Sequence, residues 1–121
     1  MKEIFKSKAL ENIKIAEIAF ENNCFNASAS RAYYAAFHAA IASIYFLGIE
    51  PRVDHKSIQT MFADNYVNRR KIIPSKYKRY LIDLQDIRNS ADYRVGVGKK
   101  IAKQQLIQAK DLIEIILRII E

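Results

Sequence analysis

The side chains best suited to chemistry in this sequence are arginines that stand within apolar stretches. Arg88 falls four residues after Leu84 and seven after Leu81, so in a helix it projects from the same stripe as two core leucines. A guanidinium in that position needs an anion, either an ion-pair partner or a substrate phosphate. Asp92, one turn later, is the expected intrahelical partner. A structural ion pair and a phosphate-binding site both remain open for Arg88.

Arg31 and His38 lie seven residues apart and therefore on one face of a helix. Arg31 has the same two interpretations as Arg88, and it would be structural if Asp83 or Asp92 reached it across the molecule. His38 stands among apolar residues, where it is either a hydrogen-bonded core residue or a proton carrier in catalysis.

Two further groups of residues could contact phosphate. His55 and Lys56 open a predicted helix, where they either bind a phosphate or are solvated. The segment 69–79 has no acidic residue and has Tyr77 and Tyr80 interleaved, as expected of a surface that follows a nucleic-acid backbone. A solvated loop is the alternative. The cationic residues of the segment 69–79 are Arg69, Arg70, Lys71, Lys76, Lys78 and Arg79.

Several kinds of active site find no support in the sequence. Two histidines and the single Cys24 give no metal-ligand spacing, so neither a metal nor a cofactor is expected. No nucleophile and base of the serine or cysteine hydrolase type can be paired. The string GVGKK at 96–100 lacks the first glycine and the Ser or Thr of a phosphate-binding loop.

The elements that must position these residues are predicted to be helices. Half of the 121 residues are hydrophobic, and only three Gly and two Pro occur. Apolar residues at helical spacing predict helices over 3–21, 28–48, 55–67, 76–93 and 99–121. Short connections between them predict an all-α fold, an up-and-down antiparallel four-helix bundle with one additional short helix, formed by a single domain of residues 1–121.

The segment 28–48 is predicted to be the central helix, because it is apolar on nearly every side. Polar residues interrupt it too often for a membrane span. Asn26 or Ser28 is expected to cap this helix, Asp54 the third and Ser75 the fourth.

The net charge and the apolar residues of the last helix indicate which kinds of partner to expect. The net charge of +7 suits an acidic partner such as nucleic acid, or serves solubility alone. A lone cysteine and a charged N-terminal segment favour a cytoplasmic protein without a membrane span. Ile115 and Ile119 widen the apolar stripe of the last helix, which predicts a homodimer or a partner protein.

Three motifs together resemble the HEPN superfamily: SRAYYAAFHAA on the central helix, His55-Lys56 on the next, and RNSADY on the fourth. The resemblance covers roughly residues 5–118 and is greatest to the small stand-alone prokaryotic HEPN proteins of the UPF0332-like group. It implies a helical bundle that commonly forms dimers. It also implies pairing with a minimal nucleotidyltransferase in toxin–antitoxin systems, and many members are metal-independent ribonucleases.

The ribonuclease motif of that family is an arginine, usually a polar residue next, and a histidine four to six residues further on. Arg88 and Asn89 match its start, but Tyr93 occupies the histidine position. A tyrosine hydroxyl, with an ordinary pKa near 10, is a poor general base at neutral pH. Little or no RNA cleavage is therefore expected.

The leading hypothesis is a protein that binds a nucleotide, an RNA or a nucleotidyltransferase partner. The residues predicted to bind the ligand are Arg31, Arg88, Asn89, Asp92, His55 and Lys56. One alternative is a metal-independent endoribonuclease in which Arg88 acts with Tyr93 or His38. Another is a structural helical adaptor without a ligand.

Overall fold

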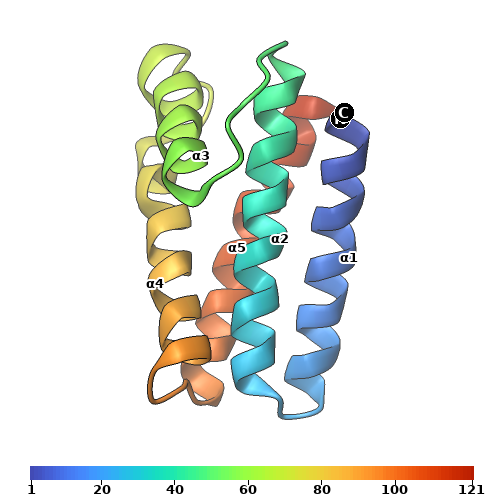
Figure 1. Ribbon diagram of the computed structural model, residues 1–121, viewed down its shortest axis with the longest axis vertical. Helices are drawn as coiled ribbons and strands as arrows, with labels where there is room; N and C mark the ends of the chain where they lie inside the picture. The colour runs from blue at the N-terminus through green and yellow to red at the C-terminus, as the bar shows by residue number, and fades with distance from the viewer.

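Helix α2 (Phe25–Phe46) lies at the centre of the protein in a computed structural model that describes residues 1–121 (Figure 1). Most of its residues are buried, and many are alanines that let neighbouring helices approach closely. Helix α1 (Lys2–Glu21) packs on one side, α4 (Tyr80–Tyr93) on the other, and α5 (Lys99–Ile120) lies behind it.

The four long helices alternate in direction, as the sequence predicted. In Figure 1, α1 and α4 run downward while α2 and α5 run upward, and the short helix α3 (His55–Phe62) lies outside, next to α2. No strand is present, so the predicted all-α bundle is confirmed. The chain ends meet, because Lys2 Nζ donates to the Ile120 carbonyl (3.3 Å) and Lys6 pairs with Glu121. None of these helices combines the length and the apolar character that a bilayer crossing requires.

The start of α2 differs from the prediction. The helix begins at Phe25, three residues early, and neither Asn26 nor Ser28 caps it. Ser28 Oγ instead donates to the Ala16 carbonyl of α1 (2.8 Å), and Asn26 Oδ1 accepts from the Val97 backbone N–H (2.7 Å). Tertiary contacts, which the local sequence does not show, take up both side chains.

The predicted cap of α3 is confirmed, but the helix is shorter than predicted. Asp54 accepts from the Ser57 backbone N–H and from the Ser57 hydroxyl, each at 2.8 Å. After Phe62 the chain continues as a π-helix, Ala63–Arg69, in which the Tyr66 hydroxyl donates to the Ser43 carbonyl of α2 (2.6 Å). Ser75 does not cap α4, because a 3₁₀ turn over Ser75–Arg79 comes first.

The apolar residues of α5 are used within the chain. Ile115 and Ile119 are half-buried and pack against the hydrophobic core of the bundle. They therefore do not form the separate exposed face from which a homodimer was predicted, although the homodimer itself stays a prediction. The exposed large apolar side chains of the long helices are Ile4, Leu10, Ile15 and Ile18 of α1, Phe46 of α2, Tyr93 of α4, and Ile101 and Ile107 of α5.

Candidate functional site

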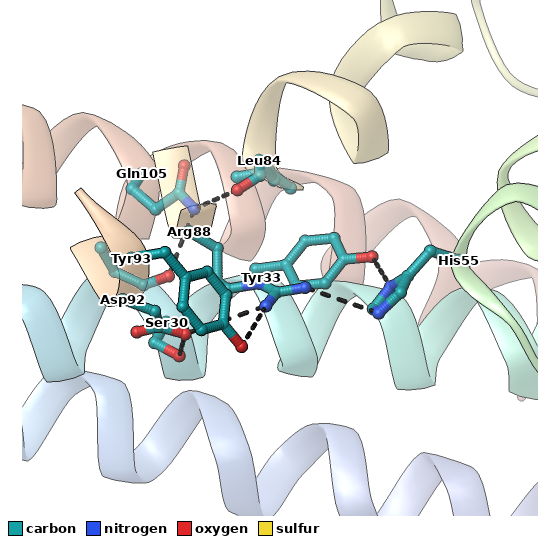
Figure 2. Close-up of polar contacts among 9 residues, drawn as sticks. Ser30, Tyr33, His55, Leu84, Arg88, Asp92, Tyr93 and Gln105 are labelled. Carbon is teal, nitrogen blue, oxygen red and sulfur yellow. Dashed lines mark hydrogen bonds and ion pairs between the residues drawn. The ribbon is translucent and has the colours of Figure 1, made fainter. Parts of the chain in front are cut away.

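Arg88 is the buried cation of α4. It follows Leu84 by one helical turn, which directs its side chain toward α2, and it is only 5% exposed. Figure 2 shows the guanidinium between Tyr33 of α2 and Tyr93 at the end of α4, with His55 of α3 beyond it. The fold thus brings residues from three helices around one positive charge.

The contacts that compensate this charge are all long. From Arg88 Nη1, the Tyr93 hydroxyl lies at 3.4 Å and Asp92 Oδ2 at 3.9 Å, while His55 Nε2 lies 3.5 Å from Nη2. The Nε atom is buried without a hydrogen-bond partner. Charge-assisted hydrogen bonds of arginine are normally about 2.7–2.9 Å long. The guanidinium is therefore held in place with its hydrogen-bonding capacity largely unused.

Aromatic rings supply most of the surroundings of this guanidinium. The carbon Cζ of Arg88 lies 5.4 Å from the ring centroid of Tyr33, 5.2 Å from that of Tyr34 and 5.6 Å from that of Tyr93. Such rings attract a cation through their quadrupole but accept no strong hydrogen bond. Tyr93 is 74% exposed because α4 ends there, so its ring remains open to solvent beside the buried charge.

His55 is oriented by Tyr33, whose hydroxyl lies 2.5 Å from His55 Nδ1. Because arginine only donates hydrogen bonds, the Nε2 atom facing Arg88 is assigned as an acceptor, and the ring proton is assigned to Nδ1. Burial, and then the charge of Arg88, lower the pKa of His55 below its usual range. His55 is consequently a neutral imidazole at neutral pH, with its lone pair directed toward the guanidinium.

The remaining predicted residues near Arg88 make few or no contacts with its guanidinium. Asp92 accepts a hydrogen bond from the Ser30 hydroxyl of α2 (3.0 Å), so its carboxylate is divided between α2 and Arg88. Asn89 is half-buried and makes no side-chain hydrogen bond, and Lys56 is exposed next to His55.

Arg31 and His38 form a neighbouring cluster on α2, facing α1. Arg31 Nη1 donates to Asn12 Oδ1 (3.0 Å), and Asn12 Nδ2 lies 3.4 Å from His38 Nδ1. Arg31 stands over the Tyr34 ring, 4.7 Å from its centroid. No carboxylate pairs with Arg31, so the ion pair with Asp83 or Asp92 that was considered from the sequence is not formed.

The pKa of His38 is lowered to about 4 by burial and by the positive charges of Lys8 and Arg31. A folded-state pKa below the unfolded value of about 6.5 stabilises the protein above pH 6.5, and this contribution is lost as the pH falls toward 4. We expect the free energy of unfolding to fall by about 1 kcal/mol between pH 7 and 5.5. Urea denaturation at both pH values measures this, and His38→Gln should flatten the dependence. His55→Asn is measured in the same way, because the lowered pKa of His55 also contributes to the pH dependence of the free energy of unfolding.

The basic segment lies apart from Arg88. Arg79, the last residue of the 3₁₀ turn, precedes Arg88 by nine residues, or about 14 Å along a helix axis. Tyr77 and Tyr80 are directed inward, and their hydroxyls donate to Asp111 of α5 at 3.0 and 3.4 Å. Arg70 donates to Asn65 Oδ1 (2.9 Å). Tyr77 is buried and Tyr80 half-buried, whereas all six cations are exposed. Contact of this segment with nucleic acid stays a prediction.

The cluster around Arg88 lies on a face of the molecule without a pocket, where Tyr93 is exposed and Arg88 is buried. The concavities of the surface, of about 70 to 410 Å³, lie elsewhere, and none is lined by Arg31, Arg88 or His55. Pockets that enclose small ligands are typically about 300–1,000 Å³. No three His, Cys, Asp or Glu side chains gather closely enough to share a metal ion.

A family model described as the HEPN domain matches residues 3–121. The chain belongs to the HEPN family. The resemblance seen in the sequence is thereby confirmed, and its Arg88 motif lies in the HEPN fold where α4 meets α2 and α3.

Relatives of this HEPN protein carry names of two kinds. It is 35% identical to "Putative toxin MJ0605" of Methanocaldococcus jannaschii over 70% of this chain and 62% of that protein. It is 39% identical to "UPF0332 protein PH1297" of Pyrococcus horikoshii over 59% and 49%, and 29% identical to "UPF0332 protein glr0978" of Gloeobacter violaceus over 71% and 67%. The match thus spans about half to two thirds of these relatives.

Sequence reasoning missed three contributors to the HEPN site: Tyr33, Tyr34 and Asn12. The tyrosines lie within the motif that carried the resemblance, two and three residues after Arg31, but their apolar neighbours made them look like core residues alone. Nothing in the sequence marks Asn12, whose role depends on how α1 docks on α2.

Proposed function

We propose that this HEPN protein binds single-stranded RNA through Arg88 and the tyrosines around it. The observation that carries the proposal is a guanidinium that is 5% exposed, whose ion pair with Asp92 is long (3.9 Å) and whose Nε has no hydrogen-bond partner. A buried cation is costly unless an anion compensates it. A phosphodiester supplies such an anion, and its two non-bridging oxygens can accept two parallel hydrogen bonds from one arginine.

The shape of the face favours a strand over a free nucleotide. The face has no enclosing pocket, and the exposed ring of Tyr93 lies beside the cation. Unpaired RNA bases stack on such rings while their phosphates contact basic side chains. The net charge of +7 adds a general attraction for the strand.

We also propose that the chain is the toxin member of a toxin–antitoxin pair acting on RNA in the cytoplasm. Support comes from family membership and from the word "toxin" in the name of the Methanocaldococcus relative. A minimal nucleotidyltransferase is the proposed protein partner, and a homodimer the proposed assembly, as the HEPN resemblance implies.

Fluorescence anisotropy with a labelled, unstructured oligoribonucleotide tests the binding proposal. We expect the single strand to bind at least about ten times more tightly than the same strand annealed to its complement, because stacking requires unpaired bases. The affinity should fall as salt rises. Absence of binding at 50 mM salt, or equal affinity for the duplex, would contradict the proposal.

A second candidate function is RNA cleavage, which the position of His55 favours. Its Nε2 lies 3.5 Å from Arg88 Nη2, and its lowered pKa keeps the ring neutral and able to accept a proton. In this reaction His55 takes the proton of a ribose 2′-hydroxyl, and the 2′-oxygen attacks the adjacent phosphorus. The bond from phosphorus to the 5′-oxygen breaks, the leaving oxygen takes a proton from solvent, and Arg88 stabilises the charge on the phosphate.

Cleavage in this way leaves 2′,3′-cyclic phosphate ends and persists in EDTA. His55→Asn is expected to lower its rate by about 10²-fold or more, whereas Arg118→Gln, on α5 outside the site, is expected to leave it unchanged. Denaturing gels of the RNA incubated with each protein measure both rates. If the wild-type protein leaves the RNA intact, as Tyr93 at the histidine position predicts, binding alone is the function.

A further inference from the structure

We propose that Arg31 is a second phosphate-binding residue, joined to Arg88 by the ring of Tyr34, so that the ligand is an RNA strand with at least two phosphates. The inference rests on the proposed RNA binding at Arg88 and specifies the ligand of that face. Arg31 lacks a carboxylate partner, and its one side-chain hydrogen bond is to the neutral amide of Asn12. Its charge is therefore also available to an anion.

Tyr34 lies against both arginines and sets an upper limit to their separation. Its ring centroid is 4.7 Å from Arg31 Cζ and 5.2 Å from Arg88 Cζ, so the two guanidinium carbons are at most about 10 Å apart. Two positive charges held at one half-buried ring repel each other, and anions bound at both would relieve that repulsion. Successive phosphates of one strand can each contact one arginine across a span of up to this length.

The surroundings of Arg31 supply a second donor. Because the Asn12 amide nitrogen only donates, His38 Nδ1 is assigned as an acceptor and the ring proton is assigned to Nε2. That N–H has no partner within the protein. Lys8 adds a third cation nearby, with its Nζ 5.0 Å from the Phe5 ring that packs on His38. The Arg31 side of the face is thus cationic and rich in donors, like the Arg88 side.

The experiment compares Arg31→Gln with Arg118→Gln, a control of equal charge loss on α5, where Arg118 pairs only with Glu114. Binding of the labelled oligoribonucleotide is measured from 50 to 200 mM salt. Each lost phosphate contact on a single strand lowers the slope of log affinity against log salt by about 0.7. We expect Arg31→Gln to bind about tenfold more weakly with that reduction, Arg31→Lys to keep the slope, and Arg118→Gln to match the wild-type protein.

Competition identifies the source of the phosphates. We expect the trinucleotide ApApA, with two linking phosphates, to displace the labelled RNA from the wild-type protein better than AMP or ADP. If ADP competes as well as ApApA, the ligand is a nucleoside diphosphate and the proposal of an RNA strand is wrong. If Arg88→Met weakens binding but Arg31→Gln matches the wild type in affinity and slope, this inference fails while the proposed function stands. If the wild-type protein binds no RNA, the proposed function fails.

Discussion

Replacing Arg88 by methionine is expected to weaken binding of single-stranded RNA by about 10- to 100-fold while the free energy of unfolding stays the same or rises. Hydrogen bonds to a charged group contribute about 1.5–3 kcal/mol, which corresponds to that range of affinity. Methionine has a similar length, and its thioether packs well against aromatic rings such as those of Tyr33 and Tyr34.

The stability expectation follows from how poorly Arg88 is paired. Replacing a buried charge by an apolar side chain of similar volume is often neutral or stabilising, provided that no partner is stranded. Asp92, the nearest carboxylate, has a side chain 28% exposed and keeps its hydrogen bond from Ser30. The substitution therefore leaves no buried anion behind.

Anisotropy and urea denaturation of the same preparations measure the two quantities, with Arg118→Met as the control for loss of one charge. A variant that binds RNA like the wild type but unfolds more easily would assign Arg88 a structural role only. That result would leave the adaptor hypothesis as the stronger one.

The fold was predictable because apolar spacing alone specifies which helix faces are buried. The residues of α2 from Ala29 to Ile44 are apolar on nearly every side, and they are surrounded by other helices as expected. The errors occur where tertiary contacts override local signals. The π-helical turn at 63–69 coincides with the Tyr66–Ser43 bond to α2, which no reading of the local sequence reveals.

The candidate site was predictable only within single helices. Helical spacing alone placed Asp92 beside Arg88, and Arg31 on one face with His38. The approach of His55 to Arg88 depends on where α3 docks, 33 residues away in sequence. Tyr93 stands five residues after Arg88, and its hydroxyl lies 3.4 Å from Arg88 Nη1 at the point where α4 ends.

Gln105 of α5 holds together the two helical turns that present the site. It is 3% exposed, and its Nε2 donates to the Leu84 carbonyl of α4 (2.7 Å) and to the Ala29 carbonyl of α2 (3.2 Å), as Figure 2 shows for Leu84. These carbonyls stand one turn before Arg88 and Tyr33, respectively. Gln105 therefore sets the position of α4 against α2 where the guanidinium meets the tyrosine ring.

Gln105→Met is accordingly expected to lower the free energy of unfolding by about 2 kcal/mol, because two buried hydrogen bonds are lost while the volume is kept. Gln104→Met, at the exposed neighbouring position, is the matched control and should stay within about 0.5 kcal/mol of the wild type. Urea denaturation measures both.

The same variant separates positioning from phosphate contact. Gln105 does not reach the open face, so its loss should weaken RNA binding several-fold through displacement of Arg88 while the salt slope stays at the wild-type value. A reduced slope would mean that a phosphate contact is lost along with the two hydrogen bonds. Unchanged affinity, despite lower stability, would show that the residues around Arg88 keep their geometry without the two Gln105 hydrogen bonds. Packing of α4 on α2 would then be sufficient to position the guanidinium.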